Sequence, residues 1–378
     1  MARRRCTGWE ALLRAALWQA ILVLPWTSYA GTSKAASPLP KAVAPAVVSR
    51  AEDARLFRIY YGQGFKVVKN SWDGNSYLLM QNTSRMAIKT KYCTGRIKSF
   101  VVPLANYSVD TSASPVSFFE LLGVLQNLQG ITSDHVSSPC VLQSYANGHV
   151  QLVNRTDAQK LSQFSAHFVS NTDKDKGCNF AAYVPAEEDT PLQIKTNYLC
   201  LSKAAADLGT RFKPIVAWIE YTQYVTDAGA EIVDATITDK RFNISDPEDM
   251  DNLHAILCTV DVVIDQTYAS DPAEYKLSTF LENINVDRNS CFSFVANHSI
   301  WRYDKRIGDS KTLDWFDGAI SQPQLVLADL VEVFFPTGNY TTVYFRNLAK
   351  EEGVTEIGPE ICGRSISTPM EPTILPCQ

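Results

Sequence analysis

The stretch from His298 to Arg306 holds the side chains best suited to bind a ligand. HSIWRYDKR combines aromatic rings with cations, namely Trp301, Arg302, Tyr303, Lys305 and Arg306. Aromatic faces stack on flat molecules, and guanidinium groups bind carboxylates and phosphates through paired hydrogen bonds. The stretch therefore predicts a site for a flat anionic ligand. The alternative is a solvated charged loop over a structural tryptophan, because charged runs usually face water.

Three carboxylates could instead support catalysis. Glu220 ends the run IVAWIE, and Asp314 and Asp317 stand in DWFDG. Glycosidases use two carboxylates with separated pKa values at strand ends, so a secreted hydrolase that uses Glu220 with Asp314 or Asp317 is one alternative function. The chain has no GxSxG, GxGxxG or Walker motif, and the GDS at 308–310 has no strand before it. We expect a non-catalytic protein and assign no catalytic residue.

The histidines give no metal signature. No two of them stand in HxH, HxxxH or HExxH spacing. His254 in LHAILC is expected to be a partly buried helix residue. The sequence therefore assigns no metal site and leaves the cofactor unknown.

Hydrophobic periodicity indicates the elements that would position these residues. FRIYYGQGFKVVKN and SYLLMQN, separated by the turn SWDGN, predict a small β appendage. Beyond residue 95 the period switches repeatedly between 2 and 3.6, which favours α/β layers. The expected strands are RIKSFVVPLAN, CNFAAYV, PIVAWIEY, VDVVID and CFSFVA.

Helices are expected between these strands. Ser114 and Gly130 would bound one helix, residues 192–208 form another, and Ser245 with Glu248 would form a capping box. A very apolar helix is expected over 322–335, with Ser321 and Gln324 as a capping pair. Asp329 and Glu332 would share its solvent-facing stripe.

Ligands of open α/β sheets bind beyond the carboxyl ends of strands. This rule selects Asn106, Tyr107 and Asp110 in the first half of the chain. In the second half it selects the following residues: Trp218, Glu220, Tyr221, Trp301, Arg302, Tyr303 and Arg306.

Three segments carry a resemblance to a known family. They are KSFVVPLANYSVDTSASPVSFFELLGVLQNLQGITS, SDPEDMDNLHAILCTVDVVID and ISQPQLVLADLVEVFFP. In order and spacing they resemble periplasmic binding proteins for cobalamin, siderophores, haem and transition metals, over about 250 residues. More narrowly, the chain resembles a branch of secreted plant proteins that carry this domain and have no established ligand.

The resemblance implies two Rossmann-like lobes joined by one helix. Its expected function is a secreted solute-binding-like protein, with a metal chelate, a siderophore or a tetrapyrrole-type anionic molecule as ligand. An extracellular interaction protein that lost its ligand site is the alternative. The chain departs from the family at the connecting helix, with only about 17 residues or roughly 25 Å, and at the short loop after WIEY.

The expected organisation runs from a cleavable leader to a cysteine-containing tail. It comprises a signal peptide (1–30), a disordered leader (31–56), the β appendage (57–92), an N-terminal lobe (93–190), a linker helix (191–212), a C-terminal lobe (213–350) and a tail (351–378). The signal rests on ARRR, the apolar run ALWQAILVLPW and the small residues Ser28 and Ala30.

The net charge of the chain limits the classes of partner that we expect. Cleavage of residues 1–30 would remove four arginines and one glutamate and leave the mature chain with a net charge of −8. This acidic balance argues against nucleic acid or an anionic membrane surface as a general partner, and no membrane span is expected after signal cleavage. A small-molecule ligand remains possible, and no protein partner is indicated.

Cysteines and sequons favour a eukaryotic secretory route. Eight cysteines follow the signal and suggest up to four disulfides: Cys93, Cys140, Cys178, Cys200, Cys258, Cys291, Cys362 and Cys377. Glycosylation sequons stand at Asn82, Asn106, Asn154, Asn243, Asn297 and Asn339. We therefore expect a secreted or lumenal glycoprotein.

Overall fold

Both strands and helices form the part of the chain that the computed structural model describes, which is residues 47–48, 54–89, 91–112, 114–170, 177–182, 192–218, 221–233, 241–288, 290 and 292–371. These residues belong to one compact unit and form three five-stranded sheets and one two-stranded sheet. Only the backbone of 47–48 and 192–200 is described, so the side chain of Cys200 is not. The predicted signal peptide, most of the leader, Glu220, Cys291 and Cys377 lie outside the described residues.

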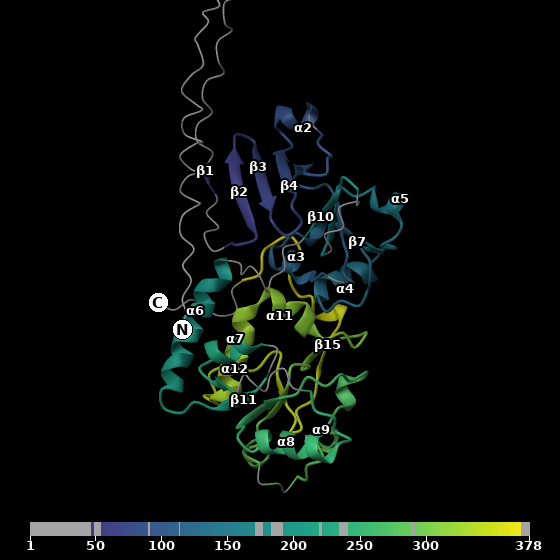
Figure 1. Ribbon diagram of the computed structural model, residues 1–378. Coiled ribbons are helices and arrows are strands. Elements are labelled where there is room, and N and C mark those ends of the chain that lie inside the picture. Colours follow the sequence, from purple (N-terminus) through teal and green to yellow (C-terminus); the bar gives the residue numbers. More distant parts are fainter. Residues whose placement is uncertain are drawn as a thin grey trace, which may run out of the picture. The chain divides into compact units, whose positions relative to one another are not determined.

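The N-terminal sheet forms where the hairpin pattern predicts a β appendage (Figure 1). Its strands, in spatial order, are β1 (Val47–Val48), β2 (Phe57–Gly62), β3 (Phe65–Asn70), β4 (Ser76–Gln81) and β5 (Ile97–Val102). The first four are antiparallel, and β5 runs parallel to β4. Helix α2 (Arg85–Lys89) connects β4 to β5. The strand predicted over 96–106 forms but is shorter, because β5 ends at Val102 and the next strand joins another sheet.

The middle sheet is entirely parallel. Its order is β10 (Phe180–Ala182), β9 (Ala166–Val169), β6 (Tyr107–Val109), β7 (Leu128–Ile131) and β8 (Gln151–Leu152). The order grows outward from β6 in both directions, so it reverses between β6 and β9. Short helices connect the strands, namely α3 (Ser117–Leu121), η1 (Leu125–Asn127), α4 (Pro139–Ala146) and α5 (Ala158–Leu161).

The prediction of one helix bounded by Ser114 and Gly130 was wrong. Helix α3 ends at Leu121, because Gly123 takes a left-handed conformation (φ 66°) and turns the chain. Gly130 lies inside β7, where it pairs with β6 and β8. Sheet pairing by Leu128 and Ile131 overrides the helical pattern of the sequence.

The C-terminal sheet follows the long helix α6 (Leu192–Gly209). Its order is β12 (Glu231–Ile232), β11 (Ile215–Ala217), β13 (Val262–Ile264), β14 (Ile300–Arg302) and β16 (Arg346–Asn347), and only β16 is antiparallel. The order reverses between β11 and β13. The connecting helices are α7 (Thr222–Asp227), α8 (Pro247–Leu257), η3 (Pro272–Glu274), α9 (Leu277–Asn283) and α10 (Ser293–Ala296).

Two predictions in this region need correction. The run CFSFVA was expected to be a strand, but Ser293–Ala296 is helix α10. His298 then reverses the chain with a positive φ of 54°, and the strand forms afterwards at Ile300–Arg302. Helix α8 is capped by Asp246, whose side chain accepts the N–H groups of the first turn, and Ser245 has no such role.

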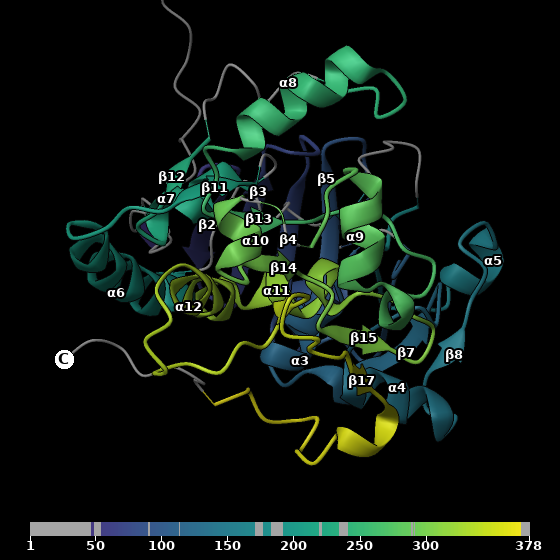
Figure 2. The same cartoon turned by 90° about the horizontal axis from the view of Figure 1, so that it is seen from below.

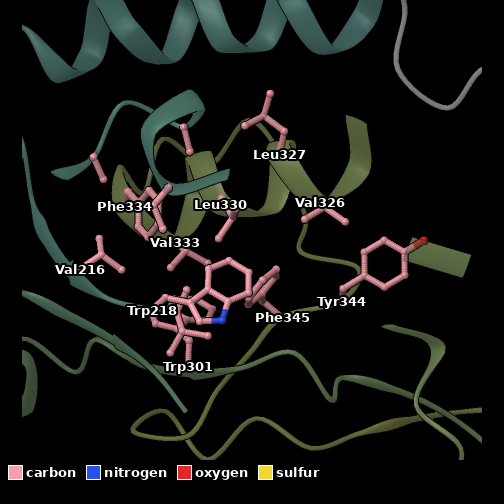
Figure 3. Packing of buried hydrophobic residues seen from close by; sticks show 14 of the residues in the cluster. Val216, Trp218, Trp301, Val326, Leu327, Leu330, Val333, Phe334, Tyr344 and Phe345 are labelled. Atoms are coloured by element: carbon pink, nitrogen blue, oxygen red, sulfur yellow. The ribbon is translucent and has the colours of Figure 1, made fainter. Parts of the chain in front are cut away.

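The apolar helix α12 (Pro323–Phe334) is confirmed and packs on the C-terminal sheet. Figure 3 shows Val326, Leu330 and Val333 of α12 above Trp218 and Phe345. On another side α12 packs along α6 (Figure 2).

The polar residues of α12 behave differently from their predicted roles. Asp329 and Glu332 are buried and accept backbone N–H groups from 343–345 and 338–340, respectively, so they do not form a solvent stripe. The predicted capping pair is also absent, because the N-cap is Gln322 without a side-chain bond and Ser321 Oγ donates to Gly318 O.

The remaining elements link the middle and C-terminal sheets. They are β15 (Arg306–Gly308), η4 (Asp314–Phe316), α11 (Gly318–Ser321), β17 (Thr355–Ile357) and η5 (Pro359–Ile361). Strands β15 and β17 pair in parallel. None of the helices among the described residues combines the length and the apolar character needed to cross a membrane.

Candidate functional site

The carboxyl ends of the middle and C-terminal sheets are the places where sheets of this kind bind ligands. The loop after β14 starts at the carboxyl end of the C-terminal sheet and continues to η4 and α11. There it meets α3 and the approach to α4, which follow strands of the middle sheet. Figure 1 shows α11 beside α3. We call this meeting point, formed by Ser117, Ser137, Asp314 and Asp317, the edge contact.

Hydrogen bonds join the two sides of the edge contact. The Ser117 backbone N–H donates to Asp317 Oδ1 (2.8 Å), and Ser117 Oγ donates to the Asp317 carbonyl oxygen (2.7 Å). Ser137 Oγ donates to Asp314 Oδ1 (2.7 Å) and lies 3.5 Å from Asp317 Oδ2. All four residues are buried. The carboxylates of Asp314 and Asp317 therefore accept hydrogen bonds from Ser117 and Ser137, which follow strands of the middle sheet.

Few cations balance these carboxylates. Within the described part of the chain, Arg306 alone lies within ion-pair distance of Asp314 or Asp317, with Nε 2.9 Å from Asp314 Oδ2. This N–H is not aligned for a hydrogen bond, so the pair is electrostatic only. Nearby, buried Glu120 accepts from Ser138 Oγ and lies 3.5 Å from Arg364 Nη1.

Burial makes ionisation of this group unfavourable. Burial and the neighbouring charge of Asp314 raise the pKa of Asp317 to about 6. Burial raises the pKa of Asp314, although Arg306 and Ser137 oppose the rise. Burial likewise raises the pKa of Glu120. The edge contact therefore holds carboxyl groups that titrate above their ordinary range.

The C-terminal tail closes over the same region. A disulfide joins Cys140 of α4 to Cys362, 222 residues later. Arg364 Nη1 donates to the Glu120 carbonyl oxygen (3.0 Å), and Met370 N donates to Leu121 O (2.9 Å). The tail is thereby fixed to the helices of the middle sheet.

The first pair of predicted ligand residues lies on the middle sheet. Tyr107 is buried inside β6, stacks on Phe119 with 5.0 Å between ring centroids, and donates to Val124 O. Asp110 directly follows β6 and accepts hydrogen bonds from Ser112 and Thr132. Burial alone would raise the pKa of Asp110, but these hydrogen bonds outweigh it and lower the pKa.

The predicted arginine and tryptophan of HSIWRYDKR are interior residues. Arg302 is bound on all sides by Asp265, Asp304, the Thr267 carbonyl oxygen and the ring of Tyr275. Burial alone would lower the pKa of Arg302, but the charges of Asp304 and Asp265 outweigh it and raise the pKa. Trp301 is 8% exposed and belongs to the core under α12. Arg306, as described above, pairs with Asp314.

The other predicted aromatic residues gather around Trp315. Trp218 and Tyr221 lie 5.8 and 5.3 Å from the Trp315 ring, and Tyr303 lies 4.9 Å from it. Trp315 Nε1 donates to Tyr221 Oη (3.1 Å). The indole N–H groups of Trp218 and Trp301 are buried and have no hydrogen-bond partner among the described residues. The structure thus brings Trp218, Tyr221, Trp301 and Tyr303 together and places Tyr107 and Asp110 on the other sheet.

Sequence reasoning missed Ser117, Ser137 and Trp315. DWFDG was considered only as a source of catalytic carboxylates, and its two aspartates are too enclosed to meet a substrate in this arrangement. A signal was available only for Ser117, which stands between the apolar residues Val116 and Phe118. Nothing in their spacing connects them to residue 317.

Other predicted sites are placed as follows. Cys93–Cys178 and Cys140–Cys362 are disulfide-bonded, which confirms disulfide formation, and Cys258 is exposed and free among the cysteines that the structure describes. Five sequon asparagines are exposed: Asn82, Asn154, Asn243, Asn297 and Asn339. Asn106 is half-buried and accepts from Ser165 N. His254 is half-buried in α8, with Nε2 2.7 Å from Ile284 O.

No family model and no curated protein matches this chain. Among the described residues, no group of three or more His, Cys, Asp or Glu side chains is arranged to hold a metal ion. The function must therefore be argued from the edge contact and from the surfaces of the sheets.

Proposed function

We propose that this chain is a secreted, non-catalytic interaction protein built on the two-lobed architecture of single-helix solute-binding proteins. In this proposal the middle sheet with its helices is one lobe, the C-terminal sheet with α12 is the other, and α6 connects them. The support comes from the strand orders, since each sheet reverses its order once, at a position where such sheets bind ligands.

The edge contact is the observation that favours an interaction role over a solute-carrier role. Asp314 and Asp317 occupy the donors that a bound solute would use on the first lobe, namely Ser117 N and Ser137 Oγ. The disulfide between Cys140 and Cys362 fixes the tail across the same face. A protein whose own side chains satisfy the facing edges has no need of a small ligand to complete them.

The ion pairs of Arg302 and Arg306 also favour an interaction role over solute binding. A siderophore, metal chelate or tetrapyrrole-type anion would need Arg302 and Arg306 as counter-charges. Both arginines already face carboxylates, Arg302 those of Asp265 and Asp304 and Arg306 that of Asp314. An anionic ligand would have to break a buried ion pair, which costs about 3–5 kcal/mol.

Solute binding remains the second candidate, and one observation favours it. The N–H groups of Trp218 and Trp301 are buried donors without a described partner near the carboxyl end of the C-terminal sheet. Buried donors of this kind are usually satisfied. A ligand oxygen that accepted from them would account for both groups.

Native mass spectrometry of the chain secreted from a eukaryotic host separates the two candidates. A thermal-shift screen with transition metals, siderophores, cobalamin and haem follows. We expect no stoichiometric small molecule and no stabilisation, whereas a ligand at a thousand times its Kd would add about 4 kcal/mol.

A matched pair of variants assigns any shift that does occur. Tyr221→Phe removes the hydroxyl that accepts from Trp315, and Tyr268→Phe removes the hydroxyl of an exposed tyrosine outside this cluster. A ligand shift that is lost in the first variant and kept in the second would establish solute binding and refute the interaction role of this site.

A further inference from the structure

Positive charge is concentrated in the N-terminal sheet. Residues 54–98 contain nine lysines and arginines against one aspartate, a net charge of +8. Residues 99–378 contain 19 basic against 36 acidic residues, a net charge of −17. The modest overall charge of −5 therefore conceals a basic module on a strongly acidic body. Such asymmetry points to an anionic partner for the basic part alone.

Most cations of this module face solvent, and Lys98 alone among the nine is buried. Besides Arg55, seven are exposed: Arg58, Lys66, Lys69, Arg85, Lys89, Lys91 and Arg96. None of the seven makes a salt bridge with any residue that the structure describes. Two of the ammonium groups lie over tyrosine rings instead, Lys69 over Tyr60 at 5.1 Å and Lys66 over Tyr61 at 5.5 Å. Their charge is available to a partner.

Strand register places two of these cations side by side on one face of the sheet, and a third lies at the same end of the sheet. Arg58 of β2 stands directly opposite Lys69 of β3, which stands opposite Ser76 of β4, which in turn pairs with Ile97 of β5. Arg96 directly precedes Ile97, so it lies at this end of the sheet but has no partner in the register. With strands about 4.8 Å apart, the three cations span four strands over roughly 14 Å. We call Arg58, Lys69 and Arg96 the basic row.

The basic row works against the stability of the sheet that carries it. Cross-strand partners lie close together on one face, and like charges directly opposite each other are destabilising. Arg58 and Lys69 form such a pair without an intervening carboxylate among the described residues. An anion bound across the row would relieve this repulsion.

We infer that the basic row binds an extended anionic polysaccharide, carboxylated or sulfated. A linear polymer can follow the basic end of this sheet while it avoids the acidic body. A bilayer fits less well, because Ile88 on α2, the most exposed large hydrophobic side chain among the described residues of this module, lies beyond the opposite end of β4, beside the sequon at Asn82. The predicted secretory route favours a matrix polymer over nucleic acid. This inference does not depend on the edge contact.

Binding of the full secreted chain to two probes tests the inference. The probes are polygalacturonate, which is carboxylated, and heparin, which is sulfated, each at 50 and 200 mM NaCl. We expect binding to at least one probe, weakened about tenfold at the higher salt because the contact is electrostatic. Comparison of the probes shows which anionic group is preferred.

A charge-matched pair of variants locates the binding site. Arg58→Ser with Lys69→Ser removes two charges from the basic row, and Lys203→Ser with Lys350→Ser removes two exposed charges from the acidic body. We expect about a tenfold loss of affinity in the first variant and less than a twofold change in the second. The melting temperature of the first variant should not fall, because a like-charge pair is removed.

Three outcomes would overturn the inference. They are no binding to either polymer at 50 mM NaCl, equal losses in the two variants, and binding to phosphatidylserine vesicles without binding to the polymers. Arg96→Ser stands outside the cross-strand pair and repeats the test if the double variant unfolds. An affinity that Arg96→Ser leaves unchanged would then count against the row.

Discussion

Two buried polar groups each contain a pair of aspartates and differ in the groups that face these carboxylates. The arginine network, formed by Asp265, Arg302, Asp304 and Arg346, sets two guanidinium groups against two carboxylates. Arg346 also donates to the carbonyl oxygens of Pro272 and Tyr275. In the edge contact, Asp314 and Asp317 face serine hydroxyls, a backbone N–H and the single cation of Arg306.

Because of this difference, we expect the two groups to contribute differently to the pH dependence of folding. In the arginine network each charge lies beside a charge of opposite sign, which stabilises it. A buried carboxylate pair with too few cations favours protonation, as the raised pKa of Asp317, about 6, indicates. The arginine network therefore stabilises the C-terminal sheet, and the stability of the edge contact depends on pH.

The largest effect is expected from Arg302→Met. This variant leaves Asp265 without its cation inside the protein, and breaking a buried pair costs about 3–5 kcal/mol. Urea unfolding at pH 7 measures the loss. Arg288→Met, which removes an exposed arginine, is the control and should shift unfolding by less than about 0.5 kcal/mol.

An unchanged unfolding midpoint for Arg302→Met would break the comparison. It would mean that Arg302 is free to serve a ligand, as the sequence alone predicted. A loss confined to ligand binding, with normal stability, would have the same meaning.

An intermediate effect of opposite sign is expected from Asp317→Asn. The amide keeps an oxygen for Ser117 N and removes the buried charge. With a pKa raised from 3.8 to about 6, the ionised carboxylate opposes folding at pH 7. Since one pKa unit corresponds to about 1.4 kcal/mol, we expect stabilisation on the order of 2 kcal/mol.

Asp309→Asn is the matched control for this variant. It neutralises an exposed aspartate in the same loop and should leave the unfolding free energy unchanged. Destabilisation by Asp317→Asn in urea unfolding at pH 7 would show that the carboxylate is ionised and favourable, as in the arginine network.

The smallest effect is expected from Ser137→Ala. The change removes the hydroxyl that donates to Asp314, and a hydrogen bond to a charged group contributes about 1.5 kcal/mol. Thermal unfolding should report a loss of about 1 kcal/mol. Ser133→Ala is the control, because it removes another hydroxyl of the same loop outside the edge contact. An equal loss of unfolding free energy in Ser133→Ala would show that the Ser137 hydroxyl has no specific role.

The fold could be predicted where the local pattern decides the structure. The apolar run of α12, the Asp-Gly turn before β4 and the mixed α/β pattern all carry their own signals. Predictions failed where distant partners decide. Phe294 lies in a helix because the chain reverses at His298, and Gly130 lies in a strand because β6 and β8 pair with it.

The site was predictable only in part for the same reason. Residues at strand ends were found by rule, yet Arg302 was taken for a ligand group because Asp265 is 37 positions away and its pairing leaves no local trace. Asp329 looked solvent-facing by helical spacing, although the backbone of Tyr344 and its neighbours binds it. Ser117 and Asp317 are separated by 200 residues, so their contact required three-dimensional information.

The pH dependence of folding tests the edge contact most directly. Unfolding free energies of the wild type and of Asp317→Asn are measured from pH 4 to pH 7.5, and their difference is plotted. Asp329, whose pKa burial raises to about 7, contributes equally to both proteins and cancels in the difference.

Asp317 has a folded pKa of about 6 and an ordinary value of 3.8, so the folded state holds the extra proton between these values. Its contribution is therefore fully present below pH 3.8 and is lost as the pH rises through 6. The account predicts little difference between the two proteins at pH 4 and a stability advantage for Asp317→Asn that grows up to pH 7. A difference that stays constant across this range, or that favours the wild type at pH 7, would contradict it.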